Sequence, residues 1–393
     1  MLTSDFKGTS LSMLGFGAMR LPLLENSAID EAQVFRMTDE ALERGVNYFD
    51  TAFPYHGGMS EIVMGKALAR HPRGSFLLAT KYPGHQIASS YDPKEVFERQ
   101  LKKCGVEYFD FYLLHNVYEH SMPVYLDKKW GIIDYFKEQK RLGRIRHLGF
   151  SSHAHLDSMK EFLDLAGEDM EFCQIQLNWL DWTLQRARDK VALLNERKIP
   201  IWVMEPLRGG KLASLSEDAE RRLKAARPDE SVPAWSFRFL QNMPGVKMIL
   251  SGMSAESQMK DNLKTFESAR PLSEAEKQML FEIAEEMKDT VPCTACRYCT
   301  DGCPMGLDIP MFLSTLNDLR FLPSTNSAMR IQGLPEESQP SACLGCGACA
   351  AVCPQKLNIP ELIGELNAKL AKIPKWADIS REREEAAKRM KSV

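Results

Sequence analysis

The feature that most constrains this 393-residue chain is a cysteine pattern that occurs twice. Each copy has four cysteines spaced C-x2-C-x2-C-x3-C, and a proline follows the last one. The second copy begins 50 residues after the first (343 − 293 = 50), and the repeat continues beyond the cysteines into Ile-Pro and Leu-Asn pairs. The cysteines are Cys293, Cys296, Cys299 and Cys303 in the first copy, and Cys343, Cys346, Cys349 and Cys353 in the second.

This spacing is typical of thiolate ligands for 4Fe–4S clusters. Three closely spaced cysteines hold one cluster, and the fourth, before the proline, ligates the other cluster in two-cluster ferredoxins. We therefore expect two clusters, one bound by Cys293, Cys296, Cys299 and Cys353, the other by Cys343, Cys346, Cys349 and Cys303. The alternatives are zinc, which usually joins two cysteines to two distant ligands, and disulfides, which favour a secretory signal that the sequence lacks.

Composition narrows the class of protein. Apolar residues make up 44% and charged residues 26% of the chain, as in a globular protein with a large core. A net charge of −3 does not favour binding to nucleic acid or to an anionic membrane. No run approaches the ~18 apolar residues that a membrane span needs. Eight of the ten cysteines belong to the repeated pattern, so we expect a reducing compartment, the cytoplasm.

Residues 10 to 290 alternate short apolar runs with amphipathic stretches. The runs are rich in Val, Ile, Leu and Phe, which suits strands buried on both faces of a parallel sheet. Helix starts between them are marked by Asp92-Pro93 and by the pair Ser273 and Glu276. The pattern predicts an α/β fold, a (β/α)8 TIM barrel, with a doubly wound sheet as the alternative. The eight runs lie at 12–17, 46–50, 76–81, 109–115, 146–151, 172–178, 199–205 and 246–252.

The chain is long enough for more than one domain. We expect the barrel over residues 1–290 and a small α-helical ferredoxin-like domain over 291–372, because each cysteine run leads into a helical segment. Residues 373–393 form a tail of alternating charges, as in a solvated helix.

Three expected strands end in a polar residue suited to proton transfer: Asp50, Lys81 and His115. Tyr55 follows Asp50 in the next loop. Because catalytic groups of a (β/α)8 barrel lie at the carboxyl ends of its strands, these four residues are candidates for one active site. Phe53, Trp179 and Trp182 could line an apolar pocket there or serve only as packing residues.

These residues belong to blocks that resemble the aldo-keto reductase family, in the same order, over most of residues 5–265. The blocks are GFGAMRLP (15–22), GVNYFDTAFPY (45–55), GFSS (149–152), EPLRGGKL (205–212) and the region of Asn262. Together with the two cysteine runs, they resemble a bacterial subfamily of iron–sulfur aldo-keto reductases.

The resemblance implies a division of roles in carbonyl reduction. Tyr55 would be the general acid that protonates the carbonyl oxygen, and Lys81 would lower the pKa of its phenol from ~10. Asp50 would keep Lys81 charged and oriented. His115 would hydrogen-bond the carbonyl oxygen, and the other seven histidines are assigned no role.

The resemblance also implies a nicotinamide cofactor. It assigns the carboxamide to Ser151, Ser152 and Gln174, and the ribose and diphosphate to backbone at Met19, Arg20 and Leu207 to Gly210, including Gly209. The loop 251–263 is expected to offer an anion site, and Asn262 belongs to it. Gly252 and Gln258 replace basic residues of NADP-specific members, and Met204 replaces an aromatic residue, so the choice between NADH and NADPH stays open. No G-x-G-x-x-G fingerprint supports a flavin.

We therefore predict a nicotinamide-dependent oxidoreductase that interconverts small carbonyl and hydroxyl compounds. Its clusters would exchange electrons with a redox protein partner or stabilise the structure. The alternative is an electron-transfer protein whose barrel is a docking or nicotinamide-sensing scaffold. An intact set of Asp50, Tyr55, Lys81 and His115 favours the enzyme, because a scaffold does not need these residues.

Overall fold

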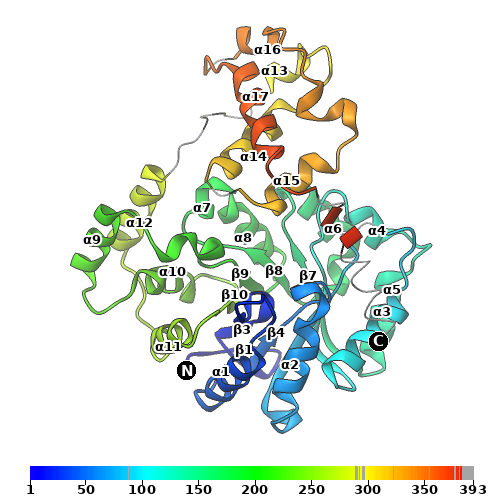
Figure 1. Ribbon diagram of the computed structural model, residues 1–393, viewed down its shortest axis with the longest axis vertical. Coiled ribbons are helices and arrows are strands. Elements are labelled where there is room, and N and C mark those ends of the chain that lie inside the picture. The colour runs from blue at the N-terminus through cyan, green and yellow to red at the C-terminus, as the bar shows by residue number, and fades with distance from the viewer. Residues whose placement is uncertain are drawn as a thin grey trace. The chain divides into compact units, whose positions relative to one another are not determined.

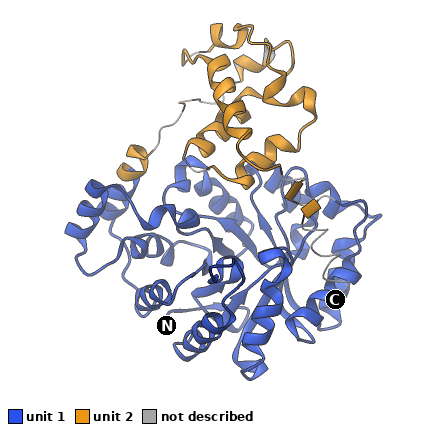
Figure 2. Ribbon diagram, viewed as in Figure 1, with its two compact units in different colours: residues 1–281 blue, residues 282–393 orange. Residues whose placement is uncertain are grey.

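The chain divides into two compact units, a barrel unit of residues 1–281 and a C-terminal unit of residues 282–393 (Figure 2). The computed structural model describes residues 1–86, 88–287, 291, 293, 297–321, 323–353, 355–375, 378–379 and 381–382. Cys296 and most of the charged tail expected over 373–393 therefore lie outside the described residues. So do residues 288–290, next to the expected domain boundary.

Eight parallel strands form a closed barrel in the first unit, which confirms the (β/α)8 prediction (Figure 1). Each of the eight apolar runs in the sequence overlaps one of these strands, although β5 extends one residue beyond its run and β7 one residue at each end. The barrel closes where β10 pairs with β3 in parallel register, Leu250 opposite Gly15. The strands are β3 (Leu14–Gly17), β4 (Tyr48–Asp50), β5 (Leu77–Tyr82), β6 (Phe109–Leu114), β7 (Ile145–Ser152), β8 (Cys173–Gln176), β9 (Ile201–Met204) and β10 (Val246–Ser251).

Helices surround the barrel, and the expected start signals are present. The Asp92 carboxylate accepts a hydrogen bond from the Glu95 amide at 2.9 Å, ahead of Pro93 in the first turn. Ser273 and Glu276 cap each other's backbone amides. The helices are α1 (Glu31–Glu43), α2 (Ser60–Leu68), α3 (Pro93–Cys104), α4 (Met122–Leu126), α5 (Ile132–Arg141), α6 (Leu156–Ala166), α7 (Asp181–Leu184), α8 (Ala187–Glu196), α9 (Glu217–Ala226), α10 (Val232–Gln241) and α11 (Glu256–Thr265). The next helix, α12 (Glu274–Glu286), begins in the barrel unit and ends in the C-terminal unit.

An antiparallel hairpin, β1 (Thr3–Phe6) and β2 (Thr9–Ser12), packs against the starts of the barrel strands. The Phe6 ring lies 5.0 Å from Trp202 and 5.8 Å from Phe111, and it is fully enclosed in the barrel core. Aromatic side chains therefore fill this end of the barrel, and the opposite, carboxyl end is left for polar groups.

The described residues of the C-terminal unit form helices and loops, with no strand among them. The sequence repeat is also a structural repeat, because α14 and α17 start 50 residues apart and pack against each other. Asn317 bonds the backbone of Val291 at 2.6 and 3.0 Å, and Asn367 bonds the Pro340 carbonyl at 3.1 Å, each just ahead of a cysteine run. The helices are α13 (Tyr298–Asp301), α14 (Ile309–Phe321), α15 (Thr325–Gln332), α16 (Ala348–Ala351) and α17 (Ile359–Leu370).

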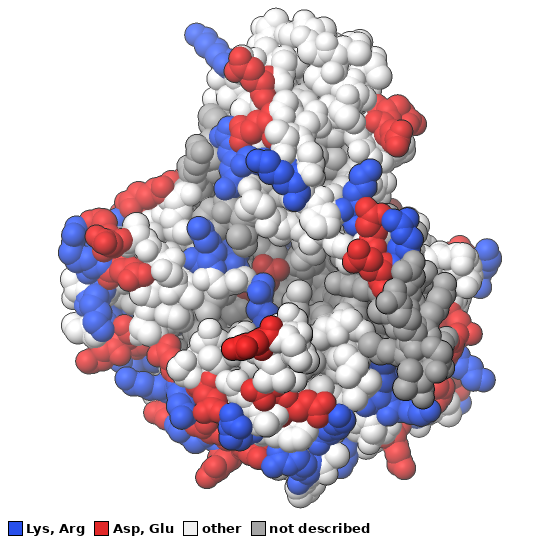
Figure 3. Space-filling model, viewed as in Figure 1, with Lys and Arg blue, Asp and Glu red and all other residues white. Residues whose placement is uncertain are grey.

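Figure 3 shows acidic and basic side chains interspersed over the visible face of the barrel unit. Over α13 and α16 of the C-terminal unit, the same view shows few charges. Of the described helices, none has the length and apolarity that crossing a membrane requires.

Candidate functional site

A buried ion pair joins two neighbouring strands at the carboxyl end of the barrel. Asp50 ends β4, and Lys81 lies near the end of β5, which pairs with β4. The Lys81 Nζ donates to Asp50 Oδ1 at 2.5 Å and to the Thr51 carbonyl at 2.8 Å. Lys81 is 0% and Asp50 3% exposed. Charges at this depth are stable only when paired, so each residue requires the other.

Tyr55 lies beside this ion pair, at the start of a short 3-10 helix, Tyr55–Gly58, after β4. The Lys81 Nζ is 4.9 Å from the centre of the Tyr55 ring. Burial alone would lower the pKa of Lys81, but Asp50 and Tyr55 outweigh it and raise that pKa above its ordinary value. Lys81 is therefore held in its charged form.

The structure does not give Tyr55 the lowered pKa that the family resemblance implies. Burial raises the pKa of the Tyr55 phenol above 10, and the nearby charges of Asp50 and Glu205 also raise it. Lys81 acts in the expected direction and lowers it, but not enough to compensate. Tyr55 is therefore a protonated phenol before substrate arrives, as a proton donor must be.

His115 follows β6 directly, and its ring meets that of Tyr55 edge-on, with ring centres 5.8 Å apart and planes at 82°. The fold thus brings together the four residues that the sequence grouped. A fifth residue, His85, was given no role, yet its ring centre lies 4.4 Å from that of His115. His85 is 6% exposed and lies in the loop after β5.

Three residues expected to bind a nicotinamide carboxamide are buried, Ser151 and Ser152 at the end of β7 and Gln174 beside Ser151 in β8. The Ser151 hydroxyl oxygen accepts the Asn116 amide at 2.8 Å, and no acceptor for its own hydrogen is found among the residues that the structure describes. The Ser152 hydroxyl is used internally, since it donates to the Val117 carbonyl at 2.8 Å and accepts from Ala154 at 3.1 Å. Gln174 Oε1 is buried without a hydrogen-bond partner among the described residues. An amide N–H of a ligand fits that acceptor.

The residues expected along the ribose and diphosphate lie in loops after β3, β9 and β10. Met19 and Arg20 follow β3, and the Arg20 carbonyl accepts the Ser254 hydroxyl at 2.8 Å. A Cβ at Gly252 would lie 3.3 Å from the Arg20 Cβ, so the aliphatic part of the Arg20 side chain packs against this exposed glycine. Leu207, Gly209 and Gly210 turn the chain after β9, the two glycines with φ of 67° and 98°.

The side chains of the last two cofactor candidates bond within the loop and helix that follow β10. The Gln258 side chain accepts the Ser254 amide at 2.8 Å. The Asn262 side chain donates to the Ser251 hydroxyl at 3.0 Å, at the end of β10.

A second polar centre after β8 and β9 was missed from the sequence. Asp181 is fully buried and accepts hydrogen bonds from Gln176 and Asn178, both at 2.7 Å, and from Arg208 at 3.1 Å. The pKa of the nearby Glu205 is raised to about 7, chiefly by burial and then by Asp181, against the opposite effects of Arg208 and Arg20. Glu205 directly follows β9, just as His115 follows β6, so the rule that found His115 could have found it.

The three aromatic candidates for a pocket lining pack elsewhere. The Phe53 ring lies 4.6 Å from the Lys103 ammonium of α3. Trp179 is buried and donates to the Ser236 hydroxyl of α10 at 2.8 Å. Trp182 meets Phe239 of the same helix at 5.8 Å. These contacts favour the packing alternative for all three.

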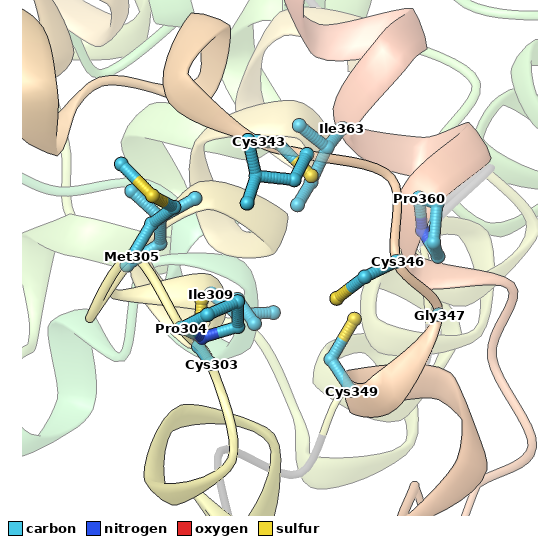
Figure 4. Close-up of a pocket in the computed structure, with 12 residues that line it drawn as sticks. Cys303, Pro304, Met305, Ile309, Cys343, Cys346, Gly347, Cys349, Pro360 and Ile363 are labelled. Carbon is cyan, nitrogen blue, oxygen red and sulfur yellow. The ribbon is translucent and has the colours of Figure 1, made fainter.

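In the C-terminal unit, four cysteines from both halves of the repeat line one pocket: Cys303, Cys343, Cys346 and Cys349 (Figure 4). Of the remaining cysteines in the repeat, Cys299 is buried in the core of this unit, and Cys293 and Cys353 pack against it. No three His, Cys, Asp or Glu side chains among the described residues converge as ligands of a single metal ion. In a cubane each thiolate binds a different iron atom, so the sulfurs lie around a shared space.

Comparison with known proteins identifies the family. The aldo/keto reductase family matches residues 13–285, and a 4Fe-4S dicluster domain matches residues 286–354. The chain belongs to the aldo/keto reductase family, whose members are NAD(P)H-dependent oxidoreductases, and it carries a C-terminal 4Fe–4S dicluster domain. The sequence-based assignments of an aldo-keto reductase domain and of a C-terminal ferredoxin-type dicluster domain are confirmed.

Individual relatives agree with this assignment. The oxidoreductase YqkF of Bacillus subtilis is 27% identical over 304 residues, covering 70% of this chain and 92% of its own length. The NADH-specific methylglyoxal reductase of Escherichia coli is 23% identical over 292 residues, covering 63% of this chain and 86% of its own. An aldo-keto reductase from Bacillus halodurans, solved in its holo form, is 28% identical with a TM-score of 0.58, covering 70% of this chain and 93% of its own.

Because the ion pair is buried, we expect a single variant that removes one charge to lose more stability than the double variant that removes both. Lys81→Met leaves the Asp50 carboxylate buried without its partner, and we expect a loss of about 3–5 kcal/mol in the free energy of unfolding. Adding Asp50→Asn removes both charges and should recover most of that loss. Denaturant unfolding followed by tryptophan fluorescence measures both effects. Equal losses in the single and double variants would contradict the prediction.

A surface pair provides the matched control for this experiment. Lys66 contacts Glu31 at 2.8 Å, but both side chains are exposed. Lys66→Met should therefore cost no more than about 1 kcal/mol.

Proposed function

We propose that the barrel unit reduces a small carbonyl compound with NADH or NADPH, with Tyr55 as the proton donor. The observation that carries this proposal is the buried pair of Asp50 and Lys81, with Lys81 Nζ beside the Tyr55 ring. A packing role would not require a buried ammonium next to a buried phenol. Family membership supports the reaction type.

The four side chains have different roles around the carbonyl oxygen of the substrate. As negative charge develops on that oxygen, Tyr55 donates its phenolic proton to it. Lys81 then stabilises the phenolate left behind, and Asp50 keeps Lys81 charged and in position. His115 polarises the same oxygen through a hydrogen bond, which has its largest effect in the transition state. The bound nicotinamide supplies the hydride for the carbonyl carbon.

The site supports a nicotinamide as the hydride source. Gln174 offers a buried acceptor and Ser151 a donor for the carboxamide. The loops of Met19 and Arg20, of Leu207 to Gly210, and of Gly252 to Asn262 would run along the rest of the cofactor. The loop after β10 provides no basic side chain at Gly252 or Gln258, but Arg20 lies against Gly252. We therefore expect weak discrimination between NADH and NADPH.

For the C-terminal unit we propose two 4Fe–4S clusters with crossed ligation. One cluster would be held by Cys343, Cys346, Cys349 and Cys303, and the shared pocket of these cysteines supports that grouping. The other would be held by Cys293, Cys296, Cys299 and Cys353. Leu344, which lines the pocket, is 67% exposed, so a redox protein could approach that cluster through a weakly charged surface (Figure 3).

Hydride transfer moves two electrons together, whereas each cluster exchanges one at a time. Direct coupling of the two units would therefore need a relay such as a flavin. Electron transfer by the C-terminal unit, with the barrel as a scaffold, remains the second candidate function, because the dicluster domain match covers residues 286–354.

Catalysis is tested at Tyr55. Tyr55→Phe removes the proton donor and little else, so kcat for carbonyl reduction should fall by about 100-fold or more. The dissociation constant of the reduced nicotinamide should change little, because the phenol acts on the carbonyl. Tyr135→Phe, on the outer helix α5, is the control with unchanged turnover. If Tyr55→Phe keeps wild-type turnover on every accepted carbonyl, this mechanism is wrong.

The clusters are tested by metal analysis of anaerobically purified protein. Two cubanes require about eight iron atoms and eight acid-labile sulfides per chain. Cys303→Ser should damage the cluster bound by Cys343, Cys346 and Cys349, leaving the other one intact. Cys104→Ser, in α3, should leave the iron content unchanged. Zinc as the main metal, or four iron atoms at full occupancy, would rule out two clusters.

The raised pKa of Glu205 leads us to expect that cofactor binding depends on pH. Its pKa is about 7, so the carboxyl is mostly neutral below that pH and negatively charged above it. A negative charge in the loop expected along the diphosphate repels the cofactor, so the dissociation constants of NADH and NADPH should rise as pH rises through 7.

Fluorescence titrations across this pH range provide the test. Glu205→Gln should abolish the step, whereas Glu217→Gln, at an exposed position in α9, should retain it. An equal step in wild type and Glu205→Gln would contradict a role for this carboxyl.

A further inference from the structure

We propose that His85 is a positioning residue that fixes the orientation of the His115 ring in the active site. The inference rests on the proposed carbonyl reduction, in which His115 hydrogen-bonds the reacting oxygen. The ring centres of His85 and His115 are 4.4 Å apart, with planes at 66°, and His85 is 6% exposed. The rings of Tyr55 and His85 therefore both meet the His115 ring edge-on.

His115 needs such contacts because its side chain does not fix its own orientation. The outer torsion of histidine is broad, so the direction of the ring nitrogens is set by packing and hydrogen bonds. A displacement of a catalytic group by about 1 Å can cost 100-fold in rate. A ring packed against His115 thus acts on catalysis without touching the substrate.

Tyr125 of α4 packs the loop that carries His85 against the barrel. The Tyr125 hydroxyl lies 2.6 Å from the His115 carbonyl and 3.1 Å from the Tyr82 carbonyl, so it links the ends of β6 and β5. The same ring lies against Gly84, where a Cβ would be only 2.6 Å from Tyr125 Cε1. Only glycine allows this close approach, and the next residue in the chain is His85.

The arrangement therefore joins the backbone and the side chain of His115 to one loop. Tyr125 holds the carbonyl of His115, and Gly84 lets the loop pack closely enough for the His85 ring to meet the His115 ring. If His85 had only a local role in its loop, Gly84 would not need to pack so closely against the ring of Tyr125, whose hydroxyl also bonds the His115 carbonyl.

A double-mutant cycle tests whether His85 acts through His115. The full chain, purified anaerobically, is assayed with NADPH and the activated aldehyde 4-nitrobenzaldehyde. His85→Ala should lower kcat/KM for the aldehyde by about tenfold, with little change in the dissociation constant of NADPH. In a His115→Ala background, the same change should cost less than about twofold, because the ring that it positions is already absent.

Controls separate this role from loss of folding. His85→Asn is the milder second variant, and thermal unfolding reports the folded fraction of each protein. His71→Ala removes a histidine that pairs with Asp39 at 2.7 Å on the outside of the barrel, and it should leave kcat/KM unchanged.

Three results are distinguishable. An equal fold-loss from His85→Ala in the wild-type and His115→Ala backgrounds would overturn the inference, since His85 would then act independently. An unchanged kcat/KM in both His85 variants would also overturn it. If the wild-type protein reduces no aldehyde with either nicotinamide, the proposed function fails, whatever the effect of His85.

Discussion

The candidate active site depends on the ion pair between Asp50 and Lys81, buried at the ends of two adjacent strands. Burial removes water from both charges, so neither is stable without the other. The same burial makes the Lys81 ammonium effective on its neighbour, because charges interact more strongly away from water. Tyr55 lies next to that ammonium, and His115 meets the Tyr55 ring edge-on. The candidate chemistry therefore follows from a single desolvated charge pair and the strand register that creates it.

Much of this arrangement could be predicted from sequence because it depends on local rules. Apolar runs ending in a polar residue placed Asp50, Lys81 and His115 at strand ends, and parallel strands bring their carboxyl ends to one side. In the C-terminal unit, repeated cysteine spacing grouped Cys303 with the second run, and that cysteine lines a pocket with Cys343, Cys346 and Cys349. The repeated Leu-Asn pair has a structural reason, since both asparagines bond the backbone ahead of a cysteine run.

The remaining features depend on contacts between distant segments. The position of His85 follows from Gly84 packing on Tyr125, and no local pattern in the loop indicates that contact. The raised pKa of Tyr55 follows from burial, which the order of residues does not reveal. Glu205 differs from these two residues, because it ends an apolar run. The rule that selected polar residues at strand ends could therefore have selected it. Its pKa of about 7 makes it a group whose charge changes near neutral pH, close to the candidate cofactor site.

Direct hydride transfer to a carbonyl in the barrel can be tested by following an isotope from the cofactor to the product. The anaerobically purified protein would reduce an aldehyde in ordinary water, using a reduced nicotinamide cofactor that carries deuterium as the transferable hydrogen at C4. Direct hydride transfer should leave one deuterium on the carbinol carbon of the alcohol, which mass spectrometry detects. An alcohol whose new C–H hydrogen comes from solvent would contradict it, and would indicate that electrons reach the substrate by another route, such as the clusters.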